Sequence, residues 1–454
     1  MELRGLKLID ILKLIESKKV SSKEVFNYFS NRSKKYNKLL NAYITILESG
    51  SGVPISYKDN FLTKGIKTTA SSNILKEYIA PYSATVVNRL LDKNFSILGK
   101  TNMDAWAHGS STETSDFGPT KNPWGLKHSP GGSSGGAAAA VTSYLSPVAI
   151  GSETAGSIRQ PASWSGVVGL KPTYGRVSRY GVIAMGSSLD SPGVLALSVE
   201  DCAYILKIIA GKDNYDATTS NEKVPDYLSL IKNNQKFTIG ISEEYLKDVN
   251  AEIRKNFFKT VEVFKKLGHN IKKIKLIDPS KSIAVYTIIQ RAEVSSNLSR
   301  YDGLRFGKDR SFFGEEAKRR IILGTFTLSQ GYIDKYYKKA QQLRTLIIND
   351  FDNAFKEVDM ILAPTTPTSA FKLGEFEKYP FFGELMDKLN EPSSISGLPG
   401  ISIPVGLGQN KLPIGMQIIG KKFAENEILN LAYQFEKETN YFGITKQLLV
   451  KYPD

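Results

Sequence analysis

The N-terminal part of the chain shows apolar positions at helical spacing. Leucine and isoleucine recur from Leu3 to Ile15 with polar and charged residues between them, a periodicity that is typical of an amphipathic helix. Ser21 and Glu24 then form the Ser-x-x-Glu pattern of a capping box, which opens a helix. We therefore expect residues 5–41 to be mostly helical.

Short apolar runs alternate with longer amphipathic stretches through much of the remaining chain. Because alternating strands and helices are typical of layered folds, we predict the α/β class, with a mixed central β-sheet covered by helices on both faces. The expected elements are strand 53–57, helix 84–93, strand 95–98, strand 237–241, helix 250–267, strand 270–276, long helix 331–355, strands 360–362, 401–405 and 414–419, and helix 424–437.

The segment 129–193 has a different composition from the rest of the chain. It is dense in Gly, Ser, Ala and Pro, which are the residues of tight turns and close backbone approach. Apolar strands at 147–150 and 167–170 and an Ala-rich helix at 133–144 interrupt it, so it is not a linker. We predict one compact domain over residues 1–454, with a catalytic core at about 50–200 and substrate-pocket and outer elements at about 201–454.

Bulk composition fits a globular protein with a large core. Of the 454 residues, 41 % are hydrophobic and 23 % charged, and no apolar run approaches the ~20 residues that cross a membrane. Cys202 is the single cysteine, so neither an internal disulfide nor a cysteine metal cluster is expected, and a reducing compartment fits best.

The net charge of +15 has two readings. A basic surface could meet a polyanion such as RNA, or the charge could reflect a Lys- and Asn-rich genome. Most lysines are scattered along the chain. One junction between a predicted helix and strand gathers five of them: Lys265, Lys266, Lys272, Lys273 and Lys275.

Histidine is scarce, which narrows the catalytic chemistry open to this chain. His108, His128 and His269 are the only three. His108 and His128 lack metal-ligand spacing with carboxylates, so no metal is implied. An amide hydrolase without a well-placed histidine needs a nucleophilic oxygen, another base and donors for the developing oxyanion.

Three segments supply candidates for these parts. Lys58 follows an apolar strand, and burial there would lower the pKa of the amine enough to make it a base. Ser133 and Ser157 lie in Gly- and Ser-rich turns, and a serine between a lysine and a nucleophile can relay the proton, as in the Ser-Lys variants of the catalytic triad.

The turn before Ser157 is the candidate oxyanion site. The backbone N–H groups of Thr154, Ala155 and Gly156 precede a predicted helix that starts near Ser157. A small-residue turn at a helix N-terminus leaves N–H groups free, and the helix dipole favours negative charge there.

These segments resemble the amidase signature family. Its hallmarks are the Gly-Gly-Ser-Ser-Gly-Gly stretch at 131–136 and the Gly-Ser-Ile-Arg-x-Pro stretch at 156–161. The resemblance implies Lys58 as base, Ser133 as relay held by a cis peptide bond, and Ser157 as the acylated nucleophile. Ala155 stands where the family usually has a second glycine.

The resemblance narrows to the glutamine-hydrolysing subunits of glutamyl-tRNA(Gln) amidotransferases, on segments 169–181, 295–303, 318–326 and 397–404. It implies that Ser157 attacks the side-chain amide of glutamine. Ammonia then passes to a B-type subunit that amidates Glu-tRNA(Gln) with ATP and Mg. It also implies a small third subunit in a heterotrimer, tRNA contact mainly through the partner, and no cofactor in this chain.

The same resemblance implies the groups that hold glutamine. Asp387 is the candidate for its α-amino group and Arg344 for its α-carboxylate, with Ser134 as a further substrate contact. Phe306 occupies a place where bacterial members tend to carry tyrosine, and the chain is shorter than the bacterial pattern between Ile46 and Pro54. The shorter segment, together with the basic composition, favours a mitochondrial (matrix) form, with a bacterial-type cytoplasmic form as the alternative.

Other functions compete with this interpretation. A stand-alone amidase on small or lipid amides would share the triad, and a non-enzymatic scaffold or RNA-binding subunit would not need it. The stretch 99–101 echoes a P-loop, but its first glycine is missing. Ser134 also fits a nucleophile elbow, for which His269 would have to be the catalytic histidine.

Overall fold

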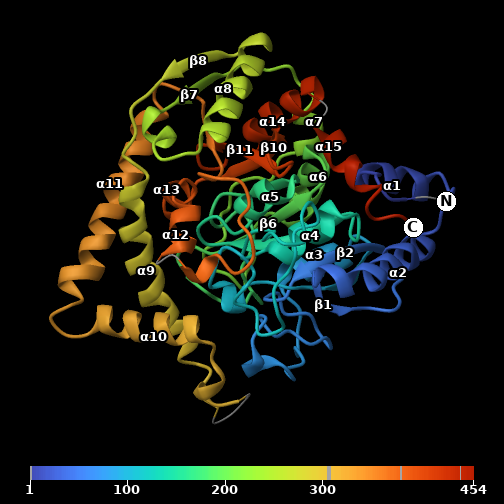
Figure 1. The fold of residues 1–454 in the computed structure, drawn as a ribbon, viewed down its shortest axis with the longest axis horizontal. Coiled ribbons are helices and arrows are strands. Elements are labelled where there is room, and N and C mark those ends of the chain that lie inside the picture. The colour runs from blue at the N-terminus through green and yellow to red at the C-terminus, as the bar shows by residue number, and fades with distance from the viewer. Residues whose placement is uncertain (1–2, 304–307, 379–380, 440) are drawn as a thin grey trace.

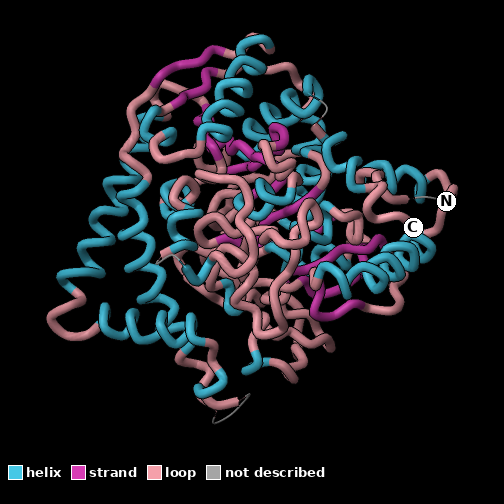
Figure 2. The backbone as a smooth tube through the Cα atoms, in the orientation of Figure 1, coloured by secondary structure: helices cyan, strands magenta, loops and turns pink. Residues whose placement is uncertain are grey.

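A single twisted β-sheet runs through the described part of the chain. The computed structural model describes residues 3–303, 308–378, 381–439 and 441–454. Eleven strands lie in the order β1-β3-β2-β4-β6-β5-β10-β11-β9-β7-β8, with parallel and antiparallel pairs (Figures 1 and 2). The strands are β1 (Tyr43–Ile46), β2 (Val53–Lys58), β3 (Phe95–Thr101), β4 (Val148–Glu153), β5 (Val168–Lys171), β6 (Ser191–Ala196), β7 (Thr238–Ile241), β8 (Asn270–Lys273), β9 (Met360–Pro364), β10 (Gly400–Leu407) and β11 (Pro413–Gly420).

Helices cover both faces of this sheet, so the predicted α/β class and mixed sheet are confirmed. Among the described residues, no helix has the length and apolar character needed to span a membrane. The helices are α1 (Leu8–Glu16), α2 (Ser22–Leu40), α3 (Thr85–Leu91), α4 (Gly135–Thr142), α5 (Arg159–Ser165), α6 (Val199–Ile209), α7 (Tyr227–Leu230), α8 (Ala251–Lys266), α9 (Ser280–Leu298), α10 (Glu315–Leu328), α11 (Lys339–Ala354), α12 (Phe382–Asp387), α13 (Glu391–Ile395), α14 (Glu425–Thr439) and α15 (Phe442–Thr445).

Strand alternation decides on which face of the sheet each side chain of β2 lies. In β2, Ile55 and Tyr57 join the large core that includes residues of α3, α6 and α14. Because successive side chains of a strand point to opposite faces, Ser56 and Lys58 point to the other side. Ala149 of β4 packs on that side with apolar residues of α4 and α5. The six residues of β2 are all buried.

Several element boundaries differ from the sequence prediction for local reasons. The predicted helix at Ser157 begins at Arg159, because the Glu153 carboxylate accepts hydrogen bonds from the backbone N–H groups of Ile158 and Arg159. The predicted helix 331–355 starts with a π-helical turn at Asp334–Lys338 before α11. The predicted strand 270–276 ends at Lys273.

Helices α9 and α10 escaped the prediction because neither shows a normal amphipathic stripe. Both α10 and α11 pack against α9, and the three helices stand at the left of the view in Figure 1. Helix α10 buries small residues such as Ala317 and Gly324 and exposes Ile322 and Phe326. A Cβ on Gly324 would lie 1.9 Å from the Arg291 carbonyl oxygen, so glycine is what permits this close helix approach.

Candidate active site

Lys58 ends strand β2 and is fully buried. Its Nζ lies 2.7 Å from Ser133 Oγ and 3.0 Å from the carbonyl oxygen of Ser152. Burial lowers the pKa of the amine to about 7, although the nearby carboxylates Asp104, Asp190 and Glu153 act in the opposite direction. A neutral amine at this distance can take the proton of the Ser133 hydroxyl.

A second buried lysine shows why the contact matters more than the pKa. Burial also lowers the pKa of Lys171 to about 7. Its Nζ, however, donates to the carbonyl oxygens of Leu398 at 2.7 Å and Pro172 at 2.9 Å. These partners accept hydrogen bonds but carry no proton that Lys171 could remove, whereas the partner of Lys58 is a hydroxyl group.

Ser133 follows two glycines in a turn that packs too closely on surrounding residues for larger side chains at these positions. The peptide bond between Gly132 and Ser133 is cis, as the resemblance implied. A Cβ on Gly132 would lie 2.1 Å from Asp104 Oδ2, and Gly131 has φ +92°. The next residue, Ser134, donates its backbone N–H to the Ser157 carbonyl oxygen at 3.2 Å. The two serine segments are therefore joined directly.

The turn at 154–157 leaves its N–H groups available. Within the described residues, the backbone N–H groups of Thr154, Ala155, Gly156 and Ser157 have no intramolecular acceptor. Four consecutive free donors beside a nucleophile candidate suit a developing oxyanion. Ala155 keeps an ordinary backbone φ, and its side chain packs in the core cluster that contains Leu189 and Ile395. The alanine therefore fits without strain where the family usually has glycine.

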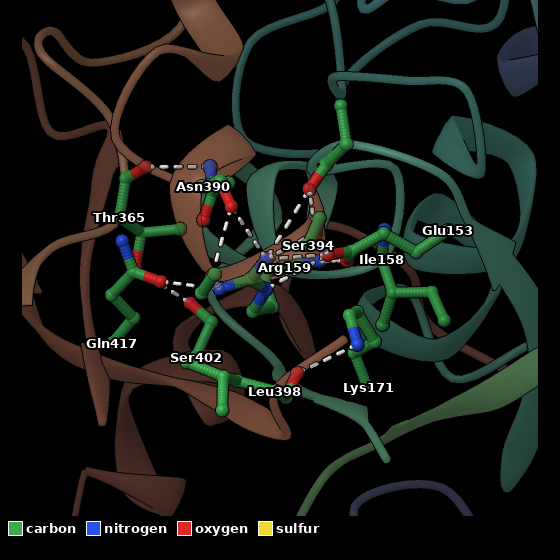
Figure 3. A network of polar contacts seen from close by, with 12 residues as sticks. Glu153, Ile158, Arg159, Lys171, Thr365, Asn390, Ser394, Leu398, Ser402 and Gln417 are labelled. Carbon is green, nitrogen blue, oxygen red and sulfur yellow. Dashed lines mark hydrogen bonds and ion pairs between the residues drawn. The ribbon is translucent and has the colours of Figure 1, made fainter. Parts of the chain in front are cut away.

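A buried ion pair closes this turn (Figure 3). Arg159 Nη2 lies 2.6 Å from Glu153 Oε1, and both side chains are fully buried. The same guanidinium donates to the Ala155 carbonyl oxygen at 3.2 Å. Its remaining hydrogen bonds go to Ser393 Oγ, Ser394 Oγ, the Asn390 carbonyl oxygen and Gln417 Oε1. Strand β4, the turn and the C-terminal third of the chain are thus held at one point.

Asp387 lies at the end of α12, beside the turn at 154–157. A Cβ on Gly156 would lie 2.2 Å from Asp387 Oδ1, and Oδ1 is buried without a hydrogen-bond partner among the described residues. Burial raises the pKa of this carboxyl well above its ordinary value. A substrate cation at Oδ1 would offset that burial and favour the carboxylate.

Ser110 is a site residue that the sequence analysis missed. Its Oγ donates to Asp387 Oδ2 at 2.7 Å, and its carbonyl oxygen accepts from Gln160 Nε2 at 3.1 Å. Ser110 therefore fixes the carboxylate with Oδ1 toward Gly156. The sequence offers no signal for this role, because Ser110 stands in a polar loop with several other hydroxyl residues.

Arg344 and Ser134 have partners within the protein. Arg344 Nη1 and Nη2 donate to Ser188 Oγ at 3.1 Å and to the Ser188 carbonyl oxygen at 3.2 Å, and Nε donates to the Ile395 carbonyl oxygen at 2.7 Å. Ser134 Oγ donates to the Ser152 carbonyl oxygen at 3.2 Å. Their substrate roles stay predictions, and Phe306 lies outside the described residues.

The P-loop-like stretch and the nucleophile elbow do not form the sites that their alternative functions would need. Lys100 is buried, with Nζ bound to the Phe61 carbonyl oxygen at 2.7 Å, so it faces no open phosphate site. His269 accepts a hydrogen bond from Phe237 N at 3.3 Å and stacks on the Phe237 ring, in the region of α8 and β8 and not at Ser134. No group of three or more metal-ligating side chains occurs among the described residues.

A cavity beside α12 does not include the candidate nucleophile in its lining. It has a volume of about 1030 Å³ and lies between α9, α10, α12 and the loop 113–119. Gly383 and Glu384 line it, and they belong to the same short helix as Asp387. The chemistry described above lies deeper, at the ends of β2 and β4.

We expect the reactivity of Ser157 to rise with pH through about 7. Lys58 carries a proton below this pKa and loses it above, so the base is available on the alkaline side. The measurement is the rate of Ser157 labelling by an electrophilic phosphonate across pH 5–9. The rate for Lys58→Met should be close to zero throughout, and a wild-type rate that is still rising without a plateau at pH 9 would contradict a lowered pKa of Lys58.

We expect Gly156→Ala to lower the labelling rate by about 100-fold, comparable to the loss of one oxyanion donor. The new Cβ would overlap Asp387 Oδ1, which is 2.2 Å away, and displace the turn. The matched variant is Ala155→Gly, which removes a methyl group from the same turn and should cost far less. Equal rates for the two variants would show that the turn tolerates displacement.

Comparisons with known proteins find similar chains over nearly the whole length. The amidase family profile matches residues 49–429. The glutamyl-tRNA(Gln) amidotransferase A-chain of Halothermothrix orenii is 46 % identical over 97 % of this chain and 98 % of its own length. The corresponding chain of Persephonella marina is 44 % identical over 96 % of this chain and 98 % of its own length.

Two solved structures show the same fold. The glutamyl-tRNA(Gln) amidotransferase A-chain from Thermotoga maritima superposes with a TM-score of 0.86 at 40 % identity, covering 96 % of each chain. A 6-aminohexanoate cyclic dimer hydrolase superposes with a TM-score of 0.90 at 26 % identity, covering 98 % of this chain and 99 % of its own. On the profile match and these near-full-length relatives, the chain belongs to the amidase family and groups with the A-chains of glutamyl-tRNA(Gln) amidotransferases.

Proposed function

We propose that this chain hydrolyses the side-chain amide of glutamine and supplies the ammonia to a tRNA-dependent amidotransferase. The observation that carries the chemistry is the contact between buried Lys58 and Ser133, whose segment is bonded to that of Ser157. The choice of glutamine is supported by the relatives that share 44–46 % identity and are named for that amidotransferase.

The proposed reaction proceeds through an ester on Ser157. Neutral Lys58 takes the proton of Ser133, and Ser133 takes the proton of Ser157, whose Oγ attacks the amide carbon. The oxyanion forms at the free N–H groups of the 154–157 turn. The C–N bond breaks as the relayed proton returns to nitrogen, so ammonia leaves. Water then attacks the ester by the same relay and releases glutamate.

Asp387 and Arg344 are the groups that we propose for the two ends of glutamine. The free Oδ1 of Asp387 lies beside Gly156 and suits the α-amino group. Arg344 is held by Ser188 and Ile395, and a guanidinium suits the α-carboxylate. Ser134 is a weaker candidate, because its hydroxyl donates to the Ser152 carbonyl oxygen.

The remaining steps are proposed for partner subunits. A B-type subunit would use ATP and Mg to activate Glu-tRNA(Gln) and would receive the ammonia, with a small third subunit completing a heterotrimer. Tertiary contacts weaken the case for a basic RNA-binding patch on this chain: Lys265, Lys266 and Lys272 pair with Glu262, Glu438 and Glu357. We therefore propose that tRNA is held mainly by the partner.

The relatives favour the bacterial-type alternative for localisation. Each relative named above comes from a bacterium. The mitochondrial expectation rested on a short early segment and a basic composition, which do not outweigh these similarities. We accordingly propose a bacterial-type cytoplasmic subunit. The division into a core at 50–200 and outer elements at 201–454 stays a prediction.

We expect Ser157→Ala and Lys58→Ala to abolish glutamine-driven amidation in the assembled complex and to spare amidation driven by added ammonium. The substitutions remove the nucleophile or its base, and free ammonia bypasses both. The measurement is formation of glutaminyl-tRNA(Gln) with each nitrogen source. Loss of both reactions would indicate a folding defect, and intact glutamine-driven activity in Ser157→Ala would rule out the proposed nucleophile.

We expect Asp387→Asn to raise the glutamine KM by at least about ten-fold, as the loss of a charge-assisted contact requires. The amide keeps the size of the side chain and its contact with Ser110 but removes the negative charge. The matched variant is Glu384→Gln, one turn earlier on α12, where the carboxylate pairs with Arg291. A KM unchanged in Asp387→Asn would remove Asp387 from the glutamine site.

A further inference from the structure

The turn at residues 185–190 precedes β6 and contacts two parts of the candidate site, namely the turn at 154–157 and Arg344. Asp190 is buried, with 5 % of its surface exposed. Its Oδ1 accepts hydrogen bonds from Thr154 Oγ1 at 2.7 Å and from Gly186 N at 3.1 Å, and its Oδ2 accepts from Met185 N at 2.9 Å. The carboxylate thus closes its own turn and holds the residue that opens the oxyanion turn.

The sheet places these two turns side by side. Strands β4 and β6 are antiparallel, and Glu153 pairs with Ser191. Thr154 directly follows Glu153 and Asp190 directly precedes Ser191, so the two residues lie next to each other where the strand pair ends. A Cβ on Gly186 would lie 3.2 Å from Thr154 Cγ2, so the 185–190 turn also packs on the Thr154 methyl group.

The same turn holds Arg344 through a different residue. Ser188 presents its Oγ and its carbonyl oxygen to the two terminal nitrogens of Arg344, at 3.1 and 3.2 Å. The Ser188 backbone N–H donates to Glu293 Oε2 at 2.9 Å, which fixes the turn to α9. Arg344 comes from α11 and Thr154 from the end of β4, so the 185–190 turn bridges two distant parts of the chain.

We propose that the 185–190 turn is a positioning element that aligns the oxyanion turn through Asp190 and Thr154 and the substrate carboxylate contact through Ser188 and Arg344. Asp190 is a positioning residue, because it acts on the reaction through Thr154. The part of the inference that concerns Arg344 rests on the proposed function, whereas the part that concerns Thr154 rests on the contacts alone. We call the contact between Asp190 and Thr154 the Asp190 arm and the contact between Ser188 and Arg344 the Ser188 arm. The two arms predict different kinetic effects.

The Asp190 arm should appear in kcat. Thr154→Val keeps the shape of the side chain but removes the hydroxyl. Asp190→Asn places an amide NH2 group opposite one of the groups that donate hydrogen bonds to the carboxylate. For glutamine hydrolysis in the assembled complex, we expect kcat to fall by about ten-fold or more in both variants, with KM changed less than about three-fold. Thr154→Ser, which restores the hydroxyl, should recover most of the loss.

Two further readouts separate positioning from a general loss of packing. The double variant Asp190→Asn with Thr154→Val should be little worse than the poorer single variant, because both changes break one contact. The acid limb of the pH profile should move to lower pH in Asp190→Asn, since that carboxylate favours protonated Lys58. The limb should stay in place in Thr154→Val.

The Ser188 arm should appear in KM. Ser188→Ala removes one of the two hydrogen bonds that hold the Arg344 tip, so we expect the glutamine KM to rise several-fold with kcat little changed. Ser187→Ala is the matched control: it removes a hydroxyl from the same turn that contacts Asn297 and neither arm. Its kinetics should equal those of the wild type.

Phosphonate labelling of Ser157 distinguishes failure of this inference from failure of the proposed function. Labelling requires no glutamine, so it should slow in Thr154→Val and Asp190→Asn even if glutamine is not the substrate. Unchanged labelling and unchanged kcat in Thr154→Val, or a Thr154→Ser variant as slow as Thr154→Val, would overturn the Asp190 arm. An unchanged KM in Ser188→Ala would overturn the Ser188 arm.

Discussion

The buried ion pair between Glu153 and Arg159 is the constraint on which the rest of the site depends. Oε1 of Glu153 meets the guanidinium at 2.6 Å, and Oε2 accepts the backbone N–H groups of Ile158 and Arg159 at 3.0 Å. The pair therefore closes a short loop from both ends and leaves the N–H groups within it unbonded. Removing one member of such a buried pair costs about 3–5 kcal/mol, because the other charge stays buried without its partner.

The remaining contacts of Arg159 extend this local constraint across the molecule. Its guanidinium binds Gln417 in β11 and Ser393 and Ser394 in α13, more than two hundred residues later in the chain. These elements follow α12, which carries Asp387 to within reach of Gly156. One arginine thus connects the turn at 154–157 with the part of the chain that supplies the proposed substrate contact.

The charge state of Lys58 follows from a balance of opposing effects. Removal from water favours the neutral amine, and Asp104, Asp190 and Glu153 favour the cation. Each of these carboxylates also has a structural role, since Asp104 accepts backbone N–H groups of the 111–114 loop, Asp190 closes the 185–190 turn, and Glu153 pairs with Arg159. The effect of burial exceeds that of the three carboxylates, so the pKa of Lys58 stays at about 7.

The sequence by itself determined the parts of the site that local chemistry fixes. The Gly- and Ser-rich stretches at 131–136 and 156–157 indicate tight turns with close backbone approach, and the apolar strand before Lys58 indicates a buried amine. The main alternation of apolar runs likewise indicated the α/β class, since a strand or helix must bury its apolar face whatever its partners are.

Only the tertiary structure decided which distant side chains meet at these turns. Ser110 binds Asp387, Asp190 binds Thr154, and Ser188 binds Arg344. The first residue of each pair stands in no pattern that sets it apart from its polar neighbours. Helices α9 and α10 were equally hidden, because α9 is enclosed by other helices and α10 turns its small residues inward. The physical reason is common to all of these cases. The partner of a polar side chain is set by how the sheet and helices pack, and the choice of that partner leaves no pattern in the residues around it.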